Sequence, residues 1–155
     1  MFITVPVPKN EQIYTYAPGS SERNKLQNAL KELSHDILEI PAIIDGKEVF
    51  TGNLGTCIEP HNHKQILAKY HKVNMQVIDM AVNAAVKART DWEEMPFYHR
   101  SAIFLKAAEL LSTKYRYLLN AATMLGQSKN VHQAEIDSAC ELIDFWRFNA
   151  YYAQK

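Results

Sequence analysis

The segment 126–155 places the tightest constraint on how this chain folds. Its apolar residues recur at alternating spacings of three and four, the period that puts side chains on one face of an α-helix. The main row comprises Ile136, Ala139, Ile143, Trp146, Ala150 and Ala153. A second row beside it comprises Val131, Ala134, Leu142, Phe145 and Tyr152. Because more than half of the circumference is apolar, we predict a buried core helix with several packing partners, capped by Ser128 or Asn130.

The polar residues of this predicted helix gather in its N-terminal half. Four of them are acidic, namely Glu135, Asp137, Glu141 and Asp144. The helix dipole favours negative charge there, although Asp137 and Glu141 repel each other four residues apart. Glu141 stands between apolar neighbours, so it is either solvated or held in the core for a cationic partner such as an amine. The residues alone leave that choice open.

Two further helical patterns precede this helix. An apolar stripe begins after Asn74, a suitable N-cap residue, and ends near Met95–Pro96. After Pro96 a second apolar pattern continues until Gly126 closes it, which is long for a globular helix. We expect a break or kink at Ser112–Thr113, because hydroxyl and β-branched residues are weaker helix formers.

The chain before these helices divides into an arm and the start of a body. Residues 1–19 are rich in proline and end in Pro18-Gly19, which predicts an extended surface arm; the body spans residues 20–155. Ser20 or Ser21 is expected to cap an amphipathic surface helix that Pro41 ends. The apolar stripe of that helix comprises Leu26, Leu30, Leu33, Ile37 and Ile40.

Two β-hairpins are predicted between the first and second helices. Asp45-Gly46 supplies positive φ at both positions of a type I′ turn and lies between two short apolar runs. Leu54–Glu59 and Gln65–Tyr70 flank a four-to-five-residue connection of turn formers around residues 60–63. We therefore expect this chain to be mainly α-helical with two short β-hairpins.

Composition excludes several functional classes. A length of 155 residues suits one domain, and 17 basic against 17 acidic residues leave no positive surplus for nucleic acid or anionic lipid. No apolar run approaches the roughly 20 residues that cross a bilayer, so we expect a soluble chain. The N-terminus lacks the features of a secretory or import leader. A small-molecule or protein partner fits better than nucleic acid.

The histidines offer a weak metal signal. His61 and His63 lie in a predicted turn near His71, where alternate residues point two imidazoles the same way, but no third or fourth ligand is evident. We interpret them as polar turn residues. His132 and Glu135 are three residues apart, and a di-metal helical bundle needs a second such pair and two more carboxylates. We interpret this pair as lying on the surface.

Neither cysteine nor glycine spacing marks a catalytic site. Cys57 lies in a predicted strand and Cys140 in an apolar helix face, which is typical of inert buried thiols in a reducing environment. The five glycines form neither a dinucleotide-binding nor a P-loop motif. We therefore predict no catalytic, cofactor-binding or metal-binding residue in this chain.

The order of motifs nevertheless resembles a known family. Three segments follow one another in the order Ile58–His63, a helix with Ala81 and Trp92, and Arg100–Ala108. This succession resembles the N-terminal third of an aldehyde dehydrogenase. Within this family, the chain more closely resembles the 1-pyrroline-5-carboxylate dehydrogenases, also called glutamate semialdehyde dehydrogenases. The segments that carry this second resemblance are Gly19–Arg23, Gly126–Lys129, Gln133–Asp137, Glu141–Phe145 and Arg147–Ala150. The match covers nearly the whole chain.

The resemblance implies an α/β aldehyde dehydrogenase-like fold and a specific reaction. Enzymes of this family oxidise L-glutamate γ-semialdehyde, in equilibrium with its cyclic imine, to L-glutamate with NAD in proline breakdown. By similarity, Glu141 is the acid that lies near the substrate's amino group, and it is expected to recognise the ammonium without taking part in bond making. Neither Cys57 nor Cys140 matches the motif of the family's nucleophile.

The resemblance also implies that this chain is incomplete. The family's nucleophilic cysteine, general base, oxyanion asparagine and NAD-binding turn belong to sequence beyond Lys155, so the chain alone is expected to be inactive. The apolar pattern is still running at Tyr151–Tyr152, which we interpret as a cut helix. A homo-oligomer is expected when the enzyme is complete, and the mitochondrial matrix is the implied compartment, otherwise the cytoplasm.

Two alternatives remain open at this stage. In a stand-alone helical interaction or dimerisation module, the apolar face left exposed by the missing domain would bind a protein partner or another copy of the chain. Membership of another aldehyde dehydrogenase subfamily would change the substrate and remove the predicted role of Glu141.

Overall fold

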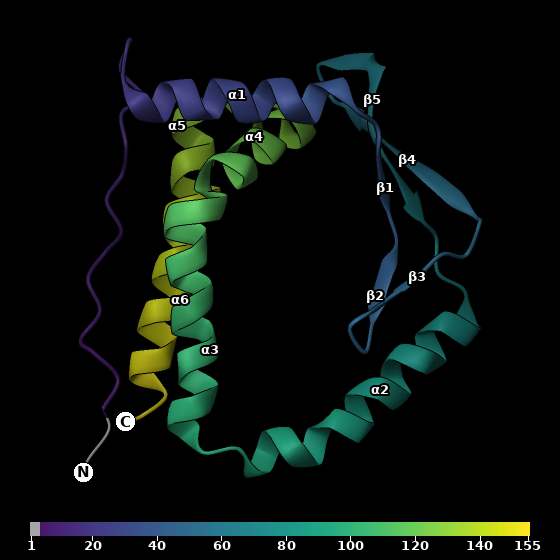
Figure 1. Ribbon diagram of the computed structural model, residues 1–155, viewed down its shortest axis with the longest axis vertical. Coiled ribbons are helices and arrows are strands. Elements are labelled where there is room, and N and C mark those ends of the chain that lie inside the picture. The colour runs from purple at the N-terminus through teal and green to yellow at the C-terminus, as the bar shows by residue number, and fades with distance from the viewer. Residues whose placement is uncertain (1–3) are drawn as a thin grey trace.

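The computed structural model describes residues 4–155, which form helices and strands arranged around an open ring (Figure 1). Helices α1 and α4 lie along one end of the ring, α3 and α6 lie side by side, α2 crosses the opposite end, and the strands occupy the remaining side. The prediction of a mainly helical chain with small sheets is confirmed.

The elements have the following bounds in chain order. They are α1 (Ser21–His35), β1 (Leu38–Ile40), β2 (Ala42–Ile44), β3 (Lys47–Val49), β4 (Leu54–Glu59), β5 (Asn62–His71), α2 (Met75–Glu94), α3 (Phe97–Leu110), the π-helical turn η1 (Leu111–Tyr115), α4 (Arg116–Gln127), α5 (Val131–Ala134), the π-helical turn η2 (Glu135–Cys140) and α6 (Glu141–Tyr152). Among the described residues, no helix has the length and apolar composition needed to cross a membrane.

Helix α1 begins as predicted but ends earlier. The Ser20 side chain accepts a hydrogen bond from the Arg23 amide, which confirms the N-cap. The prediction that the helix continues to Pro41 is wrong, because the backbone leaves the helical conformation at Asp36 and Leu38–Ile40 forms strand β1. Pairing with β5 stabilises this extended conformation, and a residue that precedes proline disfavours helix in any case.

Both hairpins are confirmed, with differences in detail. In β2–β3, Asp45 and Gly46 have φ of 52° and 71°, as a type I′ turn requires. In β4–β5, the connection is only Pro60–His61, shorter than expected, because Asn62 and His63 already belong to β5. Strand β1 pairs in parallel with β5, so the second hairpin becomes a three-stranded sheet of order β1-β5-β4.

Helix α2 is held by its first turn and lies open elsewhere. The Asn74 side chain accepts a hydrogen bond from the Val77 amide at 3.0 Å, which confirms the predicted N-cap. Val77 is the one residue of α2 that is buried within the part of the chain that the structure describes. The rest of its apolar stripe, including Ile78 and Trp92, is exposed.

The long predicted helix after Pro96 is broken where the sequence indicated. The π-helical turn η1 separates α3 from α4, and α4 leaves in a different direction (Figure 1). The hydroxyls of Ser112 and Thr113 both donate to the carbonyl of Glu109, at 3.0 and 2.7 Å. Such bonds compete with the helical ladder and favour a bend at this point.

The boundary between α4 and α5 differs from the prediction by two residues. Helix α4 passes through Gly126, and Ser128 adopts the left-handed conformation that ends it, with φ of 56°. Asn130 then starts α5, with its side chain and that of Gln133 forming a capping box. Of the two alternative caps, the structure selects Asn130, which confirms the prediction.

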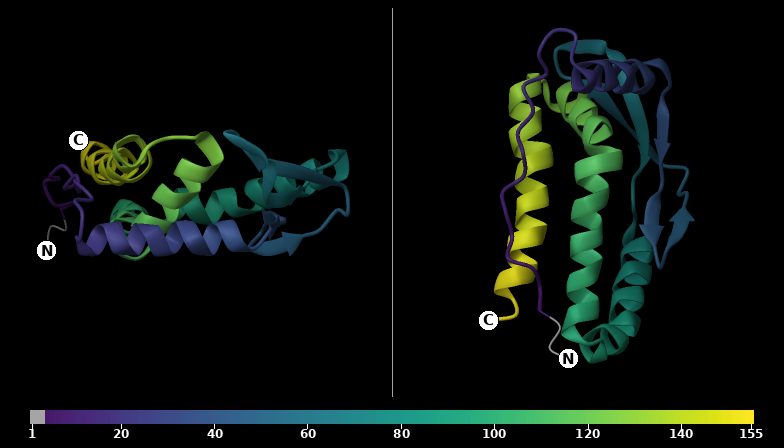
Figure 2. Two further views of the ribbon diagram at one scale, coloured as in Figure 1. Left: turned by 90° about the horizontal axis from the view of Figure 1, so that it is seen from above. Right: turned by 60° about the vertical axis from the view of Figure 1, so that its left-hand side comes forward.

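Residues 4–17 contain neither helix nor strand and run alongside α6 in the opposite direction (Figure 2). We call this segment the arm; the first three residues of the predicted 1–19 arm lie outside the described residues. At its start, the Val5 amide donates to the Gln154 side chain at 3.0 Å. At its end, Tyr16 is buried in a cluster with Leu26, Ala29 and Ala121. The arm therefore joins the α1–α4 layer to α6.

Gly55 makes a testable contact in the β4–β5 hairpin. A Cβ atom at this position would lie 2.3 Å from Cζ of Tyr70, the residue directly opposite. We predict that Gly55→Ala lowers the free energy of urea unfolding by about 1 kcal/mol, because the tyrosine ring must move. In the Tyr70→Ala background the same change should be neutral or stabilising. A double-mutant cycle without coupling would contradict this packing.

Candidate functional site

Glu141 begins α6 on the one face of that helix that the described chain leaves uncovered. The side chain of Glu141 is exposed, and Phe145 and Tyr152 follow on the same face at helical spacing. These two aromatic side chains are 59% and 57% exposed. We call Glu141, Phe145 and Tyr152 the open face of α6. The prediction of a buried core helix is therefore wrong for Phe145 and Tyr152 of the second apolar row, which the described chain leaves exposed.

The other faces of α6 have partners. Ile143 and Ala150 are buried on the side that packs against α3. Asp144 lies on the side of the arm, where its carboxylate accepts from the Glu11 amide at 2.7 Å and from the Asn10 side chain at 2.8 Å. Because two sides of the helix are fixed in this way, the direction of the open face is fixed as well.

The open face combines one charge with aromatic surface. A carboxylate beside exposed aromatic rings is a suitable surface for a cation with an organic body, since the carboxylate pairs with the charge and the rings attract it through their π faces. Exposed apolar groups of this size also indicate a surface that a ligand or another protein segment covers. The geometry therefore suits an ammonium-bearing molecule.

A second carboxylate in the same helical run, Glu135, lies in the opposite environment. Its side chain is completely buried and accepts from the Tyr14 amide at 2.8 Å, the Tyr16 hydroxyl at 2.6 Å and the Asn120 amide at 2.7 Å. Its closest charged partner is the guanidinium of Arg116, which is also fully buried. The interpretation of Glu135 as half of a surface pair with His132 is wrong.

Arg116 extends this network to the arm and to α6. Its guanidinium donates to Glu11 at 2.6 Å and to the carbonyl of Gln12, and it lies 4.0 Å from the ring centre of Tyr14. Glu11 in turn accepts from Arg147 of α6 at 2.6 Å. One arm residue therefore bridges two arginines from different helices. We call Arg116, Glu135 and their partners the buried network.

The environment shifts the pKa values of the network in opposite directions. Burial by itself raises the pKa of Glu135, but the hydrogen bonds from Arg116, Tyr16 and the Tyr14 amide outweigh it and lower the pKa below the ordinary value. Burial raises the pKa of the Tyr16 hydroxyl, and its hydrogen bond to Glu135 raises it further. Glu135 is therefore a carboxylate and Tyr16 a neutral donor at physiological pH.

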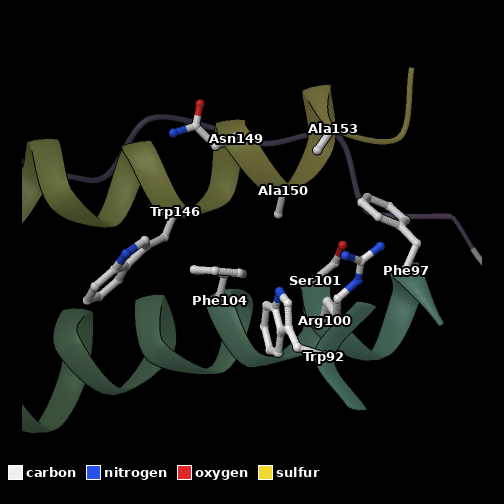
Figure 3. Close-up of a pocket in the computed structure, with 9 residues that line it drawn as sticks. All are labelled: Trp92, Phe97, Arg100, Ser101, Phe104, Trp146, Asn149, Ala150 and Ala153. Carbon is white, nitrogen blue, oxygen red and sulfur yellow. The ribbon is translucent and has the colours of Figure 1, made fainter. Parts of the chain in front are cut away.

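A groove opens between α3 and α6 beside the end of α2 (Figure 3). It has a volume of about 410 Å³, within the range of small-molecule sites. Phe104 and Trp146 point into it from opposite sides, whereas Asn149 is directed away. The full lining comprises Trp92, Phe97, Arg100, Ser101, Phe104, Trp146, Asn149, Ala150 and Ala153. No sequence pattern predicted this site, because its residues come from three separate helices.

The two cysteines differ in exposure. Cys140 is buried as predicted, and burial raises the pKa of its thiol to about 11, with the Glu135 charge adding to the shift. Cys57 is exposed on β4, so the prediction that it is buried is wrong. The prediction that Cys57 lies in a strand is confirmed, but the side of the sheet on which it lies has no covering layer in the described chain.

The histidines serve local structure. His71 is buried, accepts from the amides of Thr51 and Gly52 through Nδ1, and places Nε2 2.9 Å from Glu39. His61 lies between Glu59 and Ser128, at 2.9 and 2.7 Å, and so connects the β4–β5 turn to the end of α4. Within residues 4–155, no group of three or more metal-binding side chains comes together.

A sequence model of the aldehyde dehydrogenase family matches residues 51–155. The chain belongs to the aldehyde dehydrogenase family. This finding confirms the family resemblance inferred from the segment order, and the matched region contains the second hairpin, α2 to α6 and the candidate residue Glu141.

Relatives within this family agree on a subfamily name. A Schizosaccharomyces pombe protein named probable delta-1-pyrroline-5-carboxylate dehydrogenase is 49% identical over 97% of this chain and 28% of the relative. The human delta-1-pyrroline-5-carboxylate dehydrogenase, mitochondrial, is 44% identical over 93% of this chain and 26% of the relative. The described chain thus spans little more than a quarter of these aldehyde dehydrogenases.

Solved structures of the family have the same fold. The crystal structure of delta-pyrroline-5-carboxylate dehydrogenase from Mycobacterium tuberculosis bound with NAD superposes with a TM-score of 0.96 at 43% identity. The superposition covers 99% of this chain and 29% of that one. The helical elements, the three-stranded sheet and the arm are therefore those of an aldehyde dehydrogenase, which confirms the predicted fold class.

The buried network should dominate the stability of this aldehyde dehydrogenase segment. We predict that Glu135→Gln lowers the free energy of urea unfolding of the 155-residue chain by about 3 kcal/mol, because it leaves the buried Arg116 charge undercompensated. Glu109→Gln is the matched control: it removes the same charge from an exposed ion pair with Lys106 and should change stability by less than about 0.5 kcal/mol.

The pH dependence of stability, compared between the original chain and Glu135→Gln, separates the contribution of the Glu135 charge from that of its packing. The folded pKa of Glu135 lies below its ordinary value of 4.5, so its carboxylate stabilises the fold above that pH and loses this effect as the pH falls through the folded pKa. The stability difference between the original chain and Glu135→Gln should therefore shrink on acidification below about pH 4.5. A difference that is constant with pH would contradict the role of the charge.

Thiol accessibility provides a further prediction. At pH 8 a thiol with a pKa of about 11 is roughly one part in a thousand thiolate, so Cys140 should resist alkylation in the folded chain. Iodoacetamide labelling followed by mass spectrometry should modify the exposed Cys57 at least tenfold faster. Both should react at similar rates in urea. Rapid labelling of Cys140 in the folded chain would show that its environment is open.

Proposed function

We propose that this chain is the N-terminal portion of a dehydrogenase that oxidises L-glutamate γ-semialdehyde to L-glutamate with NAD, as in proline catabolism. The observation that carries the proposal is the agreement of relatives that cover nearly all of the chain. Proteins at 49% and 44% identity are named probable delta-1-pyrroline-5-carboxylate dehydrogenase and delta-1-pyrroline-5-carboxylate dehydrogenase. A solved structure of the delta-pyrroline-5-carboxylate dehydrogenase from Mycobacterium tuberculosis superposes on 99% of the chain with a TM-score of 0.96.

Within that reaction, we assign Glu141 to recognition of the substrate. Glutamate semialdehyde carries an ammonium group, and the open face of α6 presents a carboxylate next to Phe145. A charge-assisted hydrogen bond between ammonium and carboxylate distinguishes an amino-acid aldehyde from a plain aliphatic aldehyde. Glu141 would thus orient the substrate, while the bond-making groups come from the remainder of the enzyme.

The described residues do not fit NAD by themselves. Dinucleotides bind where clustered glycines let backbone amides approach the pyrophosphate at the start of a long helix. The glycines of this chain are isolated: Gly19, Gly46 and Gly52 have positive φ in loops and turns, and Gly55 lies under Tyr70. We therefore place the nicotinamide site, like the nucleophile, outside residues 1–155 and expect the chain alone to be inactive.

The same proposal extends to domain organisation, partners and compartment. In this proposal residues 1–19 are an extended N-terminal segment that includes the arm, and residues 20–155 are an incomplete part of an aldehyde dehydrogenase domain. The complete enzyme is proposed to be a homo-oligomer that acts on a small molecule. Relatives from human, mouse and Dictyostelium discoideum are named mitochondrial, which supports the mitochondrial matrix as its compartment.

A helical interaction module is the second candidate. It is favoured by the apolar surface of α2, where Met75, Val82 and Val86 are 69%, 55% and 65% exposed. In the leading proposal the remainder of the dehydrogenase covers this surface. In the alternative, a separate protein or a second copy of the chain does so without catalysis.

A chimera tests the leading proposal directly. Residues 1–155 replace the aligned segment of the Mycobacterium tuberculosis dehydrogenase, and NADH formation from 1-pyrroline-5-carboxylate is followed. We predict activity in the chimera and its absence in the chain alone. Glu141→Gln should lower kcat/KM for this substrate by about 10- to 100-fold, because a charge-assisted hydrogen bond is lost, and leave propanal oxidation unchanged.

Glu109→Gln in the same chimera is the control, since it removes an equal charge from the exposed side of α3. This control should leave kcat/KM unchanged for both 1-pyrroline-5-carboxylate and propanal. If the Glu141 variant keeps its preference for the amino-acid aldehyde, our assignment of that residue is wrong. A folded but inactive chimera beside an active parent enzyme would count against the function itself.

A further inference from the structure

The groove between α3 and α6 contains a cation without a partner. The Nε atom of Arg100 is buried and has no hydrogen-bond partner among residues 4–155, and Arg100 takes part in none of the ion pairs in that part of the chain. Leaving a buried charged donor unsatisfied is unfavourable. The other arginines of the helices that line the groove, Arg89 of α2 and Arg147 of α6, are both paired.

The surroundings of Arg100 define what would satisfy it. Figure 3 shows its guanidinium beside Trp92 and below Ala150 and Ala153, whose small side chains leave the space open. The hydroxyl-bearing Ser101 is its neighbour on α3. Acidic side chains are absent from the groove lining within the described chain. The site is therefore a single planar cation surrounded by aromatic and small apolar groups.

A guanidinium fork matches the two oxygens of a carboxylate, and one arginine balances one negative charge. Phosphate groups, with a higher charge, are usually bound by several cations or by a helix N-terminus with free amides. The aromatic walls formed by Trp92, Phe104 and Trp146 suit a flat or short apolar body. The volume of about 410 Å³ accommodates one small molecule.

We propose that the α3–α6 groove binds a small monocarboxylate with an aromatic or short aliphatic body, whose carboxylate pairs with Arg100. The apolar body lies between Phe104 and Trp146, and the carboxylate reaches the guanidinium at the α2 end of the groove. This inference is independent of the proposed dehydrogenase function, since it rests on neither Glu141 nor NAD.

The chain provides its own reporter for this site. It contains two tryptophans, Trp92 and Trp146, and both line the groove. Titration of the 155-residue chain with 3-phenylpropionate should therefore give a saturable change in tryptophan fluorescence, with a Kd on the order of 1 mM for a ligand of this size. The uncharged 3-phenylpropionamide should bind at least tenfold more weakly.

Two variants and a control make the test specific. Arg100→Met should weaken 3-phenylpropionate at least tenfold without changing the affinity for the amide. Arg89→Met removes an exposed arginine of α2 that is paired with Glu93 and should leave both affinities unchanged. Ala153→Leu narrows the groove at an exposed position and keeps Arg100, so it should abolish both signals while the circular dichroism spectrum is retained.

Three results would overturn the proposal. They are a fluorescence change that does not saturate, equal affinity for the acid and the amide, and undiminished binding by folded Arg100→Met. Because no dehydrogenase activity is measured, failure here would leave the function tested by the chimera unaffected.

Discussion

The buried ion pair between Arg116 and Glu135 is the interaction on which the arrangement of this chain depends. Taking both charges out of water is costly, and the cost is offset only when every oxygen and N–H finds a partner. The partners here come from the arm, from α4 and from the run α5–η2–α6. The network therefore fixes these three segments relative to one another.

One helical run thus presents two carboxylates to opposite environments. Glu135 stands at the start of the π-helical turn η2 and points into the network, whereas Glu141 follows the end of that turn and faces outward. A π-helical turn inserts a residue into the helical repeat and changes which side chains share a face, and such turns are frequent at functional sites. The buried acid contributes order, and the exposed acid is left available for a ligand.

Local chemistry made much of the fold readable from the sequence. The caps at Ser20, Asn74 and Asn130 and the Asp45-Gly46 turn depend on residues within a few positions, and each is found where a short-range argument placed it. The family resemblance and the break in the long helix were likewise predicted from short segments of sequence. Among these caps, the choice between Ser128 and Asn130 was settled by the structure.

Features that depend on distant partners were missed. Strand β1 exists because Leu38–Ile40 meets β5, and an apolar stripe that continued from α1 concealed this. Glu135 looked like a surface residue because its partner Tyr16 is 119 positions away, although the polar pair Arg116 and Asn120 on an otherwise apolar helix was a usable sign. Cys57 was misplaced because alternation along a strand does not tell which side a neighbouring layer covers.

The course of the arm along α6 has a consequence for how the molecule is made. Val5 meets Gln154 across 149 positions of sequence, so the arm finds its docking site only after α6 has been synthesised. Contacts between residues this far apart in sequence stabilise the fold only after the intervening helices have formed, and such contacts slow folding. The arm therefore depends on α6 for its docking site, and once docked it connects α6 to the α1–α4 layer.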